Sequence, residues 1–338
     1  MKIGILKFFI LTLLVFTISV IYLTFFGLET EKFNEQIKDK IKQKNNNIDL
    51  ELKKIKLTLD PINFKINAKT VGATIFYSKR PLPLEYIKTQ VSLGSLIKNK
   101  IISSNLEIST KSLLLKDLIK FVRVSNNISQ FFILEKIINN GYVILDLKLN
   151  FDELGNIKND YEIEGTIKDG NIKFTKKNNF KNINLNFNIQ KDSFLFQEIK
   201  FTSNGINFIS ELLSVKRKNN NFFLNGDFEN KKSSLNKNFL KLFKINFKGL
   251  DLENTNFRSK NNFSLEIDNK FNFKNFILNS DIHVHQLKYI KPEIIKKYLP
   301  DINEKILLND HKIRVDYKND KLSIEGNGKI QLEDKFDE

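Results

Sequence analysis

A charge-free stretch of 21 residues, from Phe8 to Leu28, is the feature that most constrains this chain. With a rise of about 1.5 Å per residue, such a helix is about 30 Å long, which matches the hydrocarbon core of a bilayer. Lys7 precedes the stretch and Glu29 follows it, and no Asp, Glu, Lys or Arg interrupts it. Because charged side chains are costly in lipid, the sequence predicts one membrane-spanning helix to which the rest of the chain is attached.

A cleaved signal peptide is the alternative interpretation of this segment. The apolar region of a signal peptide usually has about 7–15 residues and ends in small residues at a cleavage site. Here the apolar run is longer and ends in the bulky sequence TFFGL. We therefore expect an uncleaved membrane anchor, whose lipid-facing side chains are Phe8, Leu14, Ile18, Ile21, Phe25 and Leu28.

The flanking charges predict the direction in which this helix crosses the membrane. Lys2 and Lys7 lie before it, whereas Glu29 and Glu31 follow it closely. Basic residues are retained on the cytoplasmic side, so we expect a cytoplasmic N-terminus and export of the remaining chain. No second apolar run of comparable length exists, so the sequence predicts a single-pass protein.

The composition argues against several classes of function. The 338 residues carry a formal net charge of +16, but the basic residues are spread along the chain rather than clustered. Nucleic-acid-binding proteins usually gather such residues in a patch or stripe, so we expect no nucleic-acid partner. Attraction to anionic lipid headgroups stays open. The chain has no cysteine, which removes disulfides, thiol catalysis and thiolate metal sites.

Hydrophobic periodicity changes shortly after the anchor. Phe33, Ile37 and Ile41 recur at four-residue spacing, which predicts a short amphipathic helix over residues 29–47. From Ile48 onwards apolar and polar residues alternate, which is typical of strands with one apolar face. Short helices are expected to interrupt the strands at about residues 112–123, 127–139, 233–244 and 292–299.

Turn signals and missing prolines predict an extended sheet. Gly141 is placed to end the preceding helix, and Asp169-Gly170 is a hairpin signal, because both residues of a type I′ turn need a positive φ. No proline occurs between Leu84 and Lys291, and continuous strand pairing tolerates few prolines. The strand–helix alternation of parallel sheets is missing as well. The fold class predicted is mainly β, with a long antiparallel sheet.

Catalytic constellations are missing from the sequence. There is no phosphate-binding loop, nucleophile elbow or helical His-Glu zinc motif, so we expect neither an enzyme nor a cofactor. Asp281, His283 and His285 would share one strand face, which would bring metal ligands together. The alternative is a polar outward face with Ile282 and Val284 pointing inward. We favour this alternative and predict no metal site.

What remains is apolar surface on strands. The chain has 31 phenylalanines and no tryptophan. Phenylalanine stripes most often form the core between two packed sheets, and this sequence can supply a second sheet. The alternative is that the apolar face of a curved sheet stays open as a groove for acyl chains. The residues expected to face lipid in that case are Ile183, Leu185, Phe187, Ile189, Phe222, Leu224, Phe263, Leu265 and Ile267.

Three features together carry a family resemblance. They are the N-terminal span, the strand block whose turn is VSLGSLIKNK (Val91–Lys100), and GTIKDGNIKF (Gly165–Phe174) followed by the short-strand module Lys181–Phe208. In these features the chain resembles the AsmA-like envelope proteins, the AsmA, TamB and YhdP type, which look like relatives of bridge-like lipid transfer proteins. The resemblance implies an elongated, twisted antiparallel β-sheet groove. The expected organisation is the anchor at 1–28, the juxtamembrane helix at 29–47, an N-terminal β module with helices at 48–140 and the continued groove at 141–338.

The resemblance also implies a function. The protein would be anchored in a bacterial inner membrane, with its bulk in the periplasm, and would transfer phospholipid between the inner and outer membranes, supporting outer-membrane biogenesis. Membrane lipids and the inner membrane would be its partners, and the family has no catalytic residues to carry over. A sheet of this size is short for a bridge between two membranes, so we expect either the N-terminal portion of a longer protein, truncated at the C-terminus, or a short member that needs a partner.

Two other functions stay open at this point. One is an envelope scaffold that assists outer-membrane protein assembly through an envelope protein partner, without carrying lipid. The other is an envelope enzyme or a polysaccharide-binding protein, which would need clustered acids or exposed tyrosine and tryptophan platforms. The sequence has no tryptophan and no such acidic cluster.

Replacing Leu14 and Ile18 together with arginine should prevent membrane anchoring. Each arginine near the centre of the span costs about 2.5–3.5 kcal/mol on insertion scales. In a density gradient, the wild-type chain should float with the membranes and the double-arginine variant should not. A double-phenylalanine variant at the same positions keeps the segment apolar and should still float. Flotation of the arginine variant would show that this segment is not the anchor.

Overall fold

The protein is mainly β, as the sequence predicts. In this computed structural model, 64% of the chain is strand, and one antiparallel sheet of 18 strands is open rather than closed into a barrel. The structure describes residues 2–94, 103–125, 129–152, 156–173, 179–237, 250–251, 255–270, 272–291, 293–298, 305–331 and 336–337.

The chain divides into two compact units. Unit 1 comprises Met1–Glu135 and Val143–Gly165, and unit 2 comprises Lys136–Tyr142 and Thr166–Glu338. The elements of unit 1 are α1 (Lys2–Phe25), β1 (Leu28–Thr30), α2 (Asn34–Lys44), β2 (Ile48–Glu51), β3 (Ile55–Asp60), β4 (Lys65–Val71), β5 (Thr74–Tyr77), β6 (Arg80–Ser92), β7 (Ser103–Thr110), β8 (Leu113–Leu114) and α4 (Leu115–Ser125). Three elements contribute residues to both units: α5 (Ser129–Ile137), β9 (Ile138–Asn150) and β10 (Glu162–Lys173).

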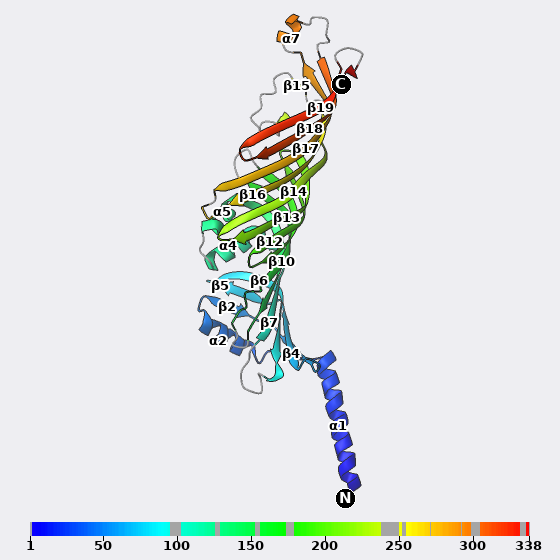
Figure 1. Ribbon diagram of the computed structural model, residues 1–338. Helices are drawn as coiled ribbons and strands as arrows, with labels where there is room; N and C mark the ends of the chain where they lie inside the picture. Colours follow the sequence, from blue (N-terminus) through cyan, green and yellow to red (C-terminus); the bar gives the residue numbers. More distant parts are fainter. Residues whose placement is uncertain are drawn as a thin grey trace. The chain divides into compact units, whose positions relative to one another are not determined.

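Unit 2 is an antiparallel meander. Its further elements are β11 (Asn179–Gln190), β12 (Ser193–Ser203), β13 (Ile206–Lys218), β14 (Asn221–Ser234), β15 (Leu250–Asp251), β16 (Asn256–Ile267), β17 (Phe273–Ile290), α7 (Glu293–Tyr298), β18 (Lys305–Lys318), β19 (Lys321–Gln331) and β20 (Phe336–Asp337). Strands β11 to β14 pair in sequence order, β14 pairs with β16, and the order continues to β19 (Figure 1). Among the described residues, β20 covers only Ile330 and Gln331 of β19.

Helix α1 is the predicted membrane-spanning segment. From Gly4 to Phe25 it is long and apolar enough to cross a membrane, and none of that stretch is buried in the protein. The helix ends at Phe25, and Gly27 follows with a φ of +72°, at a place where a Cβ would clash with the carbonyl oxygen of Leu57. Water disfavours such a continuous exposed apolar surface, whereas the hydrocarbon core of a membrane accommodates it. The helix is therefore suited to be a membrane anchor.

The juxtamembrane segment differs in part from its prediction. A helix was expected over residues 29–47, but Leu28–Thr30 form β1, which pairs with β3. The helix itself, α2, starts at Asn34, where the side-chain amide donates to the carbonyl oxygen of Lys53 at 3.1 Å. The short strand is missed by periodicity because three residues are too few to show an alternation.

Three of the four expected helical insertions lie in the described residues and are confirmed as α4, α5 and α7. The insertion expected at 233–244 falls largely outside the described residues, and β14 continues through Ser234. In the last hairpin, Tyr317 pairs with Leu322 across Asn319 and Asp320, which both adopt positive φ.

Two glycine-based expectations are wrong. Gly141 does not end a helix, because α5 stops at Ile137 and Gly141 lies inside β9 with a φ of +129°. A Cβ on Gly141 would lie 2.8 Å from the Cα of Gly170, so two backbones approach closely at these glycines. Asp169-Gly170 is not a hairpin turn either, since both residues lie within β10. Asp169 does adopt the expected positive φ, of 53°, but it does so within a strand.

Left-handed residues recur in three consecutive strands. Asp169 in β10, Asn182 in β11 and Glu198 in β12 have φ values of 53°, 53° and 52°. Such residues interrupt the alternation of a strand and increase its twist. In β12 the two phenylalanines before Glu198, Phe194 and Phe196, have even numbers, whereas the buried residue after it, Ile199, has an odd number. The interruption therefore keeps the apolar side chains of both halves of the strand on one face.

The main described core of unit 2 lies at one end of this apolar face. Ile206, Phe208 and Phe257 are buried to 0%, 6% and 4% exposure. The side chains packed against them are Phe201, Phe228, Leu235, Ile282 and Val284. Ile282 and Val284 thus point inward, as the sequence predicts. We call these eight residues the core cluster.

Truncating Phe208 to alanine should lower the free energy of unfolding by about 3–5 kcal/mol, because it removes a buried ring and leaves a cavity. Urea-induced unfolding of the whole chain in a fixed detergent would measure the change. Phe273→Ala is the matched control, since the ring of Phe273 is 72% exposed and its loss should change stability by less than about 0.5 kcal/mol. Equal losses in both variants would contradict this assignment of the core.

The turn between β16 and β17 is held by a carboxylate. Asp268 accepts hydrogen bonds from the backbone N–H groups of Lys270 and Asn272, both at 2.9 Å, and from Nδ2 of Asn272 at 3.0 Å. Nζ of Lys274 lies 3.1 Å from Oδ2 of Asp268. The bonds from Asn272 above all, with those from Lys274 and Lys270, favour the charged form and hold the pKa of Asp268 well below its ordinary value.

Asp268→Ala should therefore lower the melting temperature at neutral pH, and this loss should shrink in acid. Because the folded-state pKa is depressed, the stabilisation is present above the unfolded-state pKa of about 3.9 and is lost as the pH falls through the folded-state pKa. Melting curves of both chains between about pH 7 and pH 3 would measure the difference. A loss that stays constant down to pH 3 would contradict the prediction.

Candidate functional site

The strand register of unit 2 assembles a row of apolar side chains across eight strands (Figure 1). In an antiparallel pair, directly opposite residues lie on the same face of the sheet. Following the opposite pairs from β11 to β19 gives Phe187, Phe196, Leu213, Gly226, Phe263, Leu278, Tyr317 and Leu322. We call this set the apolar row. No charged residue interrupts it.

Further apolar side chains widen the row on the same face. A second line of opposite residues runs through Ile189, Phe194, Val215, Leu224 and Leu265. Five phenylalanine rings also contact one another in order across the sheet, with centroids 5.2–5.9 Å apart: Phe180, Phe201, Phe208, Phe228 and Phe263. The aromatic contacts connect the apolar row to the core cluster.

The apolar row is only partly covered. Its side chains from Phe187 to Tyr317 are half-buried, and Leu322 is 60% exposed. The three buried residues of the core cluster, Ile206, Phe208 and Phe257, by contrast reach 0–6% exposure on the same face. Within the described part of unit 2, the contacts between strands are those of hydrogen-bonded neighbours, and no second sheet lies over the row. The described part of unit 2 thus leaves this face without the covering layer of a sandwich.

The structure brings most of the residues expected to face lipid onto this surface. Phe187 and Phe263 belong to the apolar row, Ile189, Leu224 and Leu265 to the second line, and Phe222 pairs with Ile267. Leu185 is half-buried, while Ile183 is buried at 8% exposure. Ile183 lies against Gly170, whose missing side chain makes room for it.

Sequence reasoning missed five side chains of the apolar row as lipid-facing candidates, namely Phe196, Leu213, Leu278, Tyr317 and Leu322. For β12 the reason is the irregularity around Glu198, and for β13 it is the register shift between Ile209 and Leu213, because both break the simple alternation used to pick out stripes. Tyr317 and Leu278 become neighbours of Phe263 only through the pairing of β16, β17 and β18, which periodicity within one strand does not reveal.

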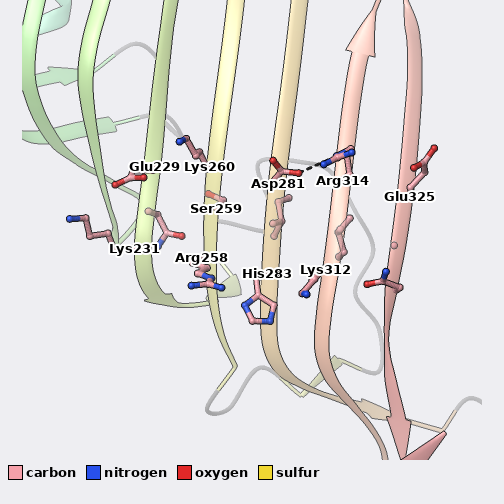
Figure 2. Close-up of a pocket in the computed structure, with 15 residues that line it drawn as sticks. Glu229, Lys231, Arg258, Ser259, Lys260, Asp281, His283, Lys312, Arg314 and Glu325 are labelled. Carbon is pink, nitrogen blue, oxygen red and sulfur yellow. Dashed lines mark hydrogen bonds and ion pairs between the residues drawn. The ribbon is translucent and has the colours of Figure 1, made fainter. Parts of the chain in front are cut away.

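The opposite, polar face carries an open pocket of about 900 Å³ over β14, β16, β17, β18 and β19 (Figure 2). One row of opposite residues across it alternates in charge: Glu229, Lys260, Asp281, Arg314 and Glu325. Nε of Arg314 donates to Oδ1 of Asp281 at 3.2 Å, and this bond raises the pKa of Arg314. Opposite charges on facing residues stabilise a sheet, so this row has a structural explanation.

The next row of opposite residues across the same pocket carries basic side chains that no acidic residue of the row balances. Arg258 lies opposite His283, and His283 lies opposite Lys312. In Figure 2 the imidazole of His283 lies between these two basic side chains. Burial lowers the pKa of His283, and the charges of His285, Arg258 and Lys312 lower it further against the opposing effect of an aspartate, Asp310. The imidazole is therefore held in its neutral form at neutral pH.

A metal-ligand grouping of Asp281 with His283 and His285 is the interpretation that the sequence does not favour, and the structure does not form it. Asp281 is paired with Arg314, while Asp310 from β18 lies near both histidines. The sequence gives no hint of Asp310, since its approach depends on the register of β17 and β18.

No protein-family model, curated protein or solved structure matches this chain. The resemblance to the AsmA-like envelope proteins therefore stays a prediction. The two faces of unit 2, one apolar and one polar, are the features from which a function has to be inferred.

Proposed function

We propose that this protein is a membrane-anchored lipid carrier, which holds phospholipid acyl chains on the apolar row and transfers them between membranes. The observation that supports this proposal is the apolar row itself, half-buried across consecutive strands and without a covering sheet among the described residues. Large apolar surfaces that a soluble domain leaves partly exposed usually mark interaction sites.

The energetics favour such a surface for lipid transfer. Each acyl methylene costs about 0.8 kcal/mol when it enters water, so a phospholipid with about 30 methylenes faces a barrier on the order of 20 kcal/mol. A line of phenylalanine, leucine and valine side chains offers the tails an apolar partner and lowers this barrier. No reaction, nucleotide or cofactor is needed for that, and lipid can enter from a membrane that α1 keeps close.

The cellular setting belongs to the same proposal. Lysines at the start of α1 and glutamates after it favour a cytoplasmic N-terminus, with both β units on the other side of the membrane. With the resemblance to AsmA-like proteins, this supports an inner-membrane anchor, a periplasmic body and transfer of phospholipid toward the outer membrane. The protein would then contribute to outer-membrane biogenesis.

Photo-crosslinking in the full-length, membrane-inserted chain tests the proposal. A benzophenone amino acid at Phe263, in the apolar row, should form adducts with phospholipid that mass spectrometry detects. The same amino acid at Asn262 is the matched control, because Asn262 directly precedes Phe263 in β16 and is exposed on the polar face. Protein adducts instead of lipid at Phe263 would favour a scaffold for outer-membrane proteins, and no adduct at all would contradict lipid binding.

A charged side chain on the apolar face should prevent lipid from binding there. With the crosslinker kept at Phe263, Leu224→Asp places a carboxylate in the second line and should lower the lipid adduct yield by at least about tenfold, because desolvating a carboxylate costs several kcal/mol. Asn225→Asp adds the same charge to the next residue, which is exposed on the opposite face, and should leave the yield unchanged. Unchanged melting curves would show that both variants are folded. Equal yields in the two variants would contradict the proposal.

A further inference from the structure

The polar face of unit 2 holds a compact group of metal-ligand side chains that the proposed lipid carrier does not use. His283 and His285 lie two residues apart on β17 and so project from the same face. Asp310 on β18 is opposite His285, because the flanking pairs Val284–His311 and Gln286–Asn309 fix the register there. The ligand atoms of the three side chains all lie within 4.8 Å of one another.

We propose that His283, His285 and Asp310 form a binding site for a divalent transition-metal ion of the Zn²⁺ type. Nε2 of His283 and Nδ1 of His285 lie 3.5 Å and 3.9 Å from Oδ1 of Asp310, and the two imidazole centroids are 4.4 Å apart. Ligands of tetrahedral zinc at about 2.0–2.2 Å from the ion are themselves about 3.3–3.5 Å apart. The distances from Oδ1 of Asp310 are close to that range, and all three ligand atoms lie within 4.8 Å of one another.

The hydrogen-bonding state of His283 supports a ligand role. Both of its ring nitrogens are buried, and neither has a hydrogen-bond partner. Buried polar atoms are usually satisfied, so an imidazole with two unsatisfied nitrogens calls for an explanation. A metal ion on Nε2 supplies one partner that the described protein groups do not supply.

The carboxylate of Asp310 is also available for a metal ion. The carboxylate of Asp281, which is closer to the two histidines in sequence, is not. Asp281 is bound to Arg314, but the close charged neighbours of Asp310 within the described residues are the two histidines. Asp310 has a φ of +49°, a left-handed conformation that few non-glycine residues adopt and that aspartate tolerates better than most. Asp310 lies at the register shift between Asn309 and Lys312 in the pairing of β18 with β19, and an irregularity of this kind redirects a side chain.

The donor set determines which ions fit. Two imidazole nitrogens and one carboxylate suit Zn²⁺, Co²⁺, Ni²⁺ or Cu²⁺, whereas Ca²⁺ and Mg²⁺ prefer sites made of oxygen alone. Three protein ligands leave at least one coordination position for water or another small ligand, on the side of the open pocket. Because the ligands come from β17 and β18, a bound ion would also clip these two strands together.

Two cationic neighbours weaken the site without excluding it. Arg258 and Lys312 flank His283 (Figure 2), and their charges repel an incoming cation. The same charges disfavour the proton that competes for the imidazole, and metal binding requires the neutral ring. Both side chains are exposed, so their charged ends can move into solvent while the stems stay in place.

Zinc titration of the untagged full chain in detergent tests the site. After removal of metal with a chelator and removal of the chelator, calorimetry with Zn²⁺ should give one site per chain. His285→Ala and Asp310→Asn should each weaken binding by at least about tenfold, which is the scale of effect for groups that hold a metal. Two matched controls should bind as the wild type does. They are Asp281→Asn, a carboxylate of the same strand face, and His311→Asn, a histidine on the opposite face.

A second measurement keeps the proposal falsifiable if a variant folds poorly. Co²⁺ added to the wild-type chain should give a visible absorption band that Zn²⁺ abolishes, and Zn²⁺ should raise the wild-type melting temperature. Equal zinc affinity in His285→Ala, Asp310→Asn and the two controls would mean adventitious surface binding and would overturn the proposal. Failure of the wild-type chain to bind Zn²⁺ would overturn it as well, whereas lipid adducts at Phe263 would be unaffected.

Discussion

The fold of unit 2 depends on cross-strand register, because register decides which side chains share a face. A slip of one residue in any pair of strands would move a whole set of phenylalanines from one face to the other. The apolar row persists through eight strands only because each pairing keeps the same phase. Left-handed residues such as Glu198 adjust the phase within a strand, so that irregular backbone preserves a regular surface.

The sequence predicts the class of fold well, and it also predicts that strands have one apolar face, since both follow from local patterns. The charge-free run before Leu28 predicts α1, and alternation of the type seen in β11 predicts strands with one apolar face. Local signals fail where tertiary contacts decide. Gly141 and Asp169-Gly170 carry the marks of a helix end and a hairpin, but both glycines instead let two backbones approach within a sheet.

The candidate sites show the same limit. Phe187 and Phe263 are recognisable as members of stripes, but that they lie in one row with Tyr317 follows from pairings between strands far apart in sequence. On the polar face, two histidines at a spacing of two residues are visible in the sequence. The carboxylate that joins them is not Asp281, two positions away, but Asp310 on the next strand, and only the register of β17 and β18 identifies it.

The sparse pairing of β19 has a consequence for how this protein behaves at high protein concentration. Beyond Ile330 and Gln331, the outer backbone groups of β19 meet no further strand among the described residues, and Leu322 and Ile324 are 60% and 62% exposed. An unprotected sheet edge of this kind is a template for edge-to-edge aggregation. Lys321 and Glu325 flank the apolar residues of this edge and act as gatekeepers. A neighbouring chain that added a strand there would have to accommodate these two charges.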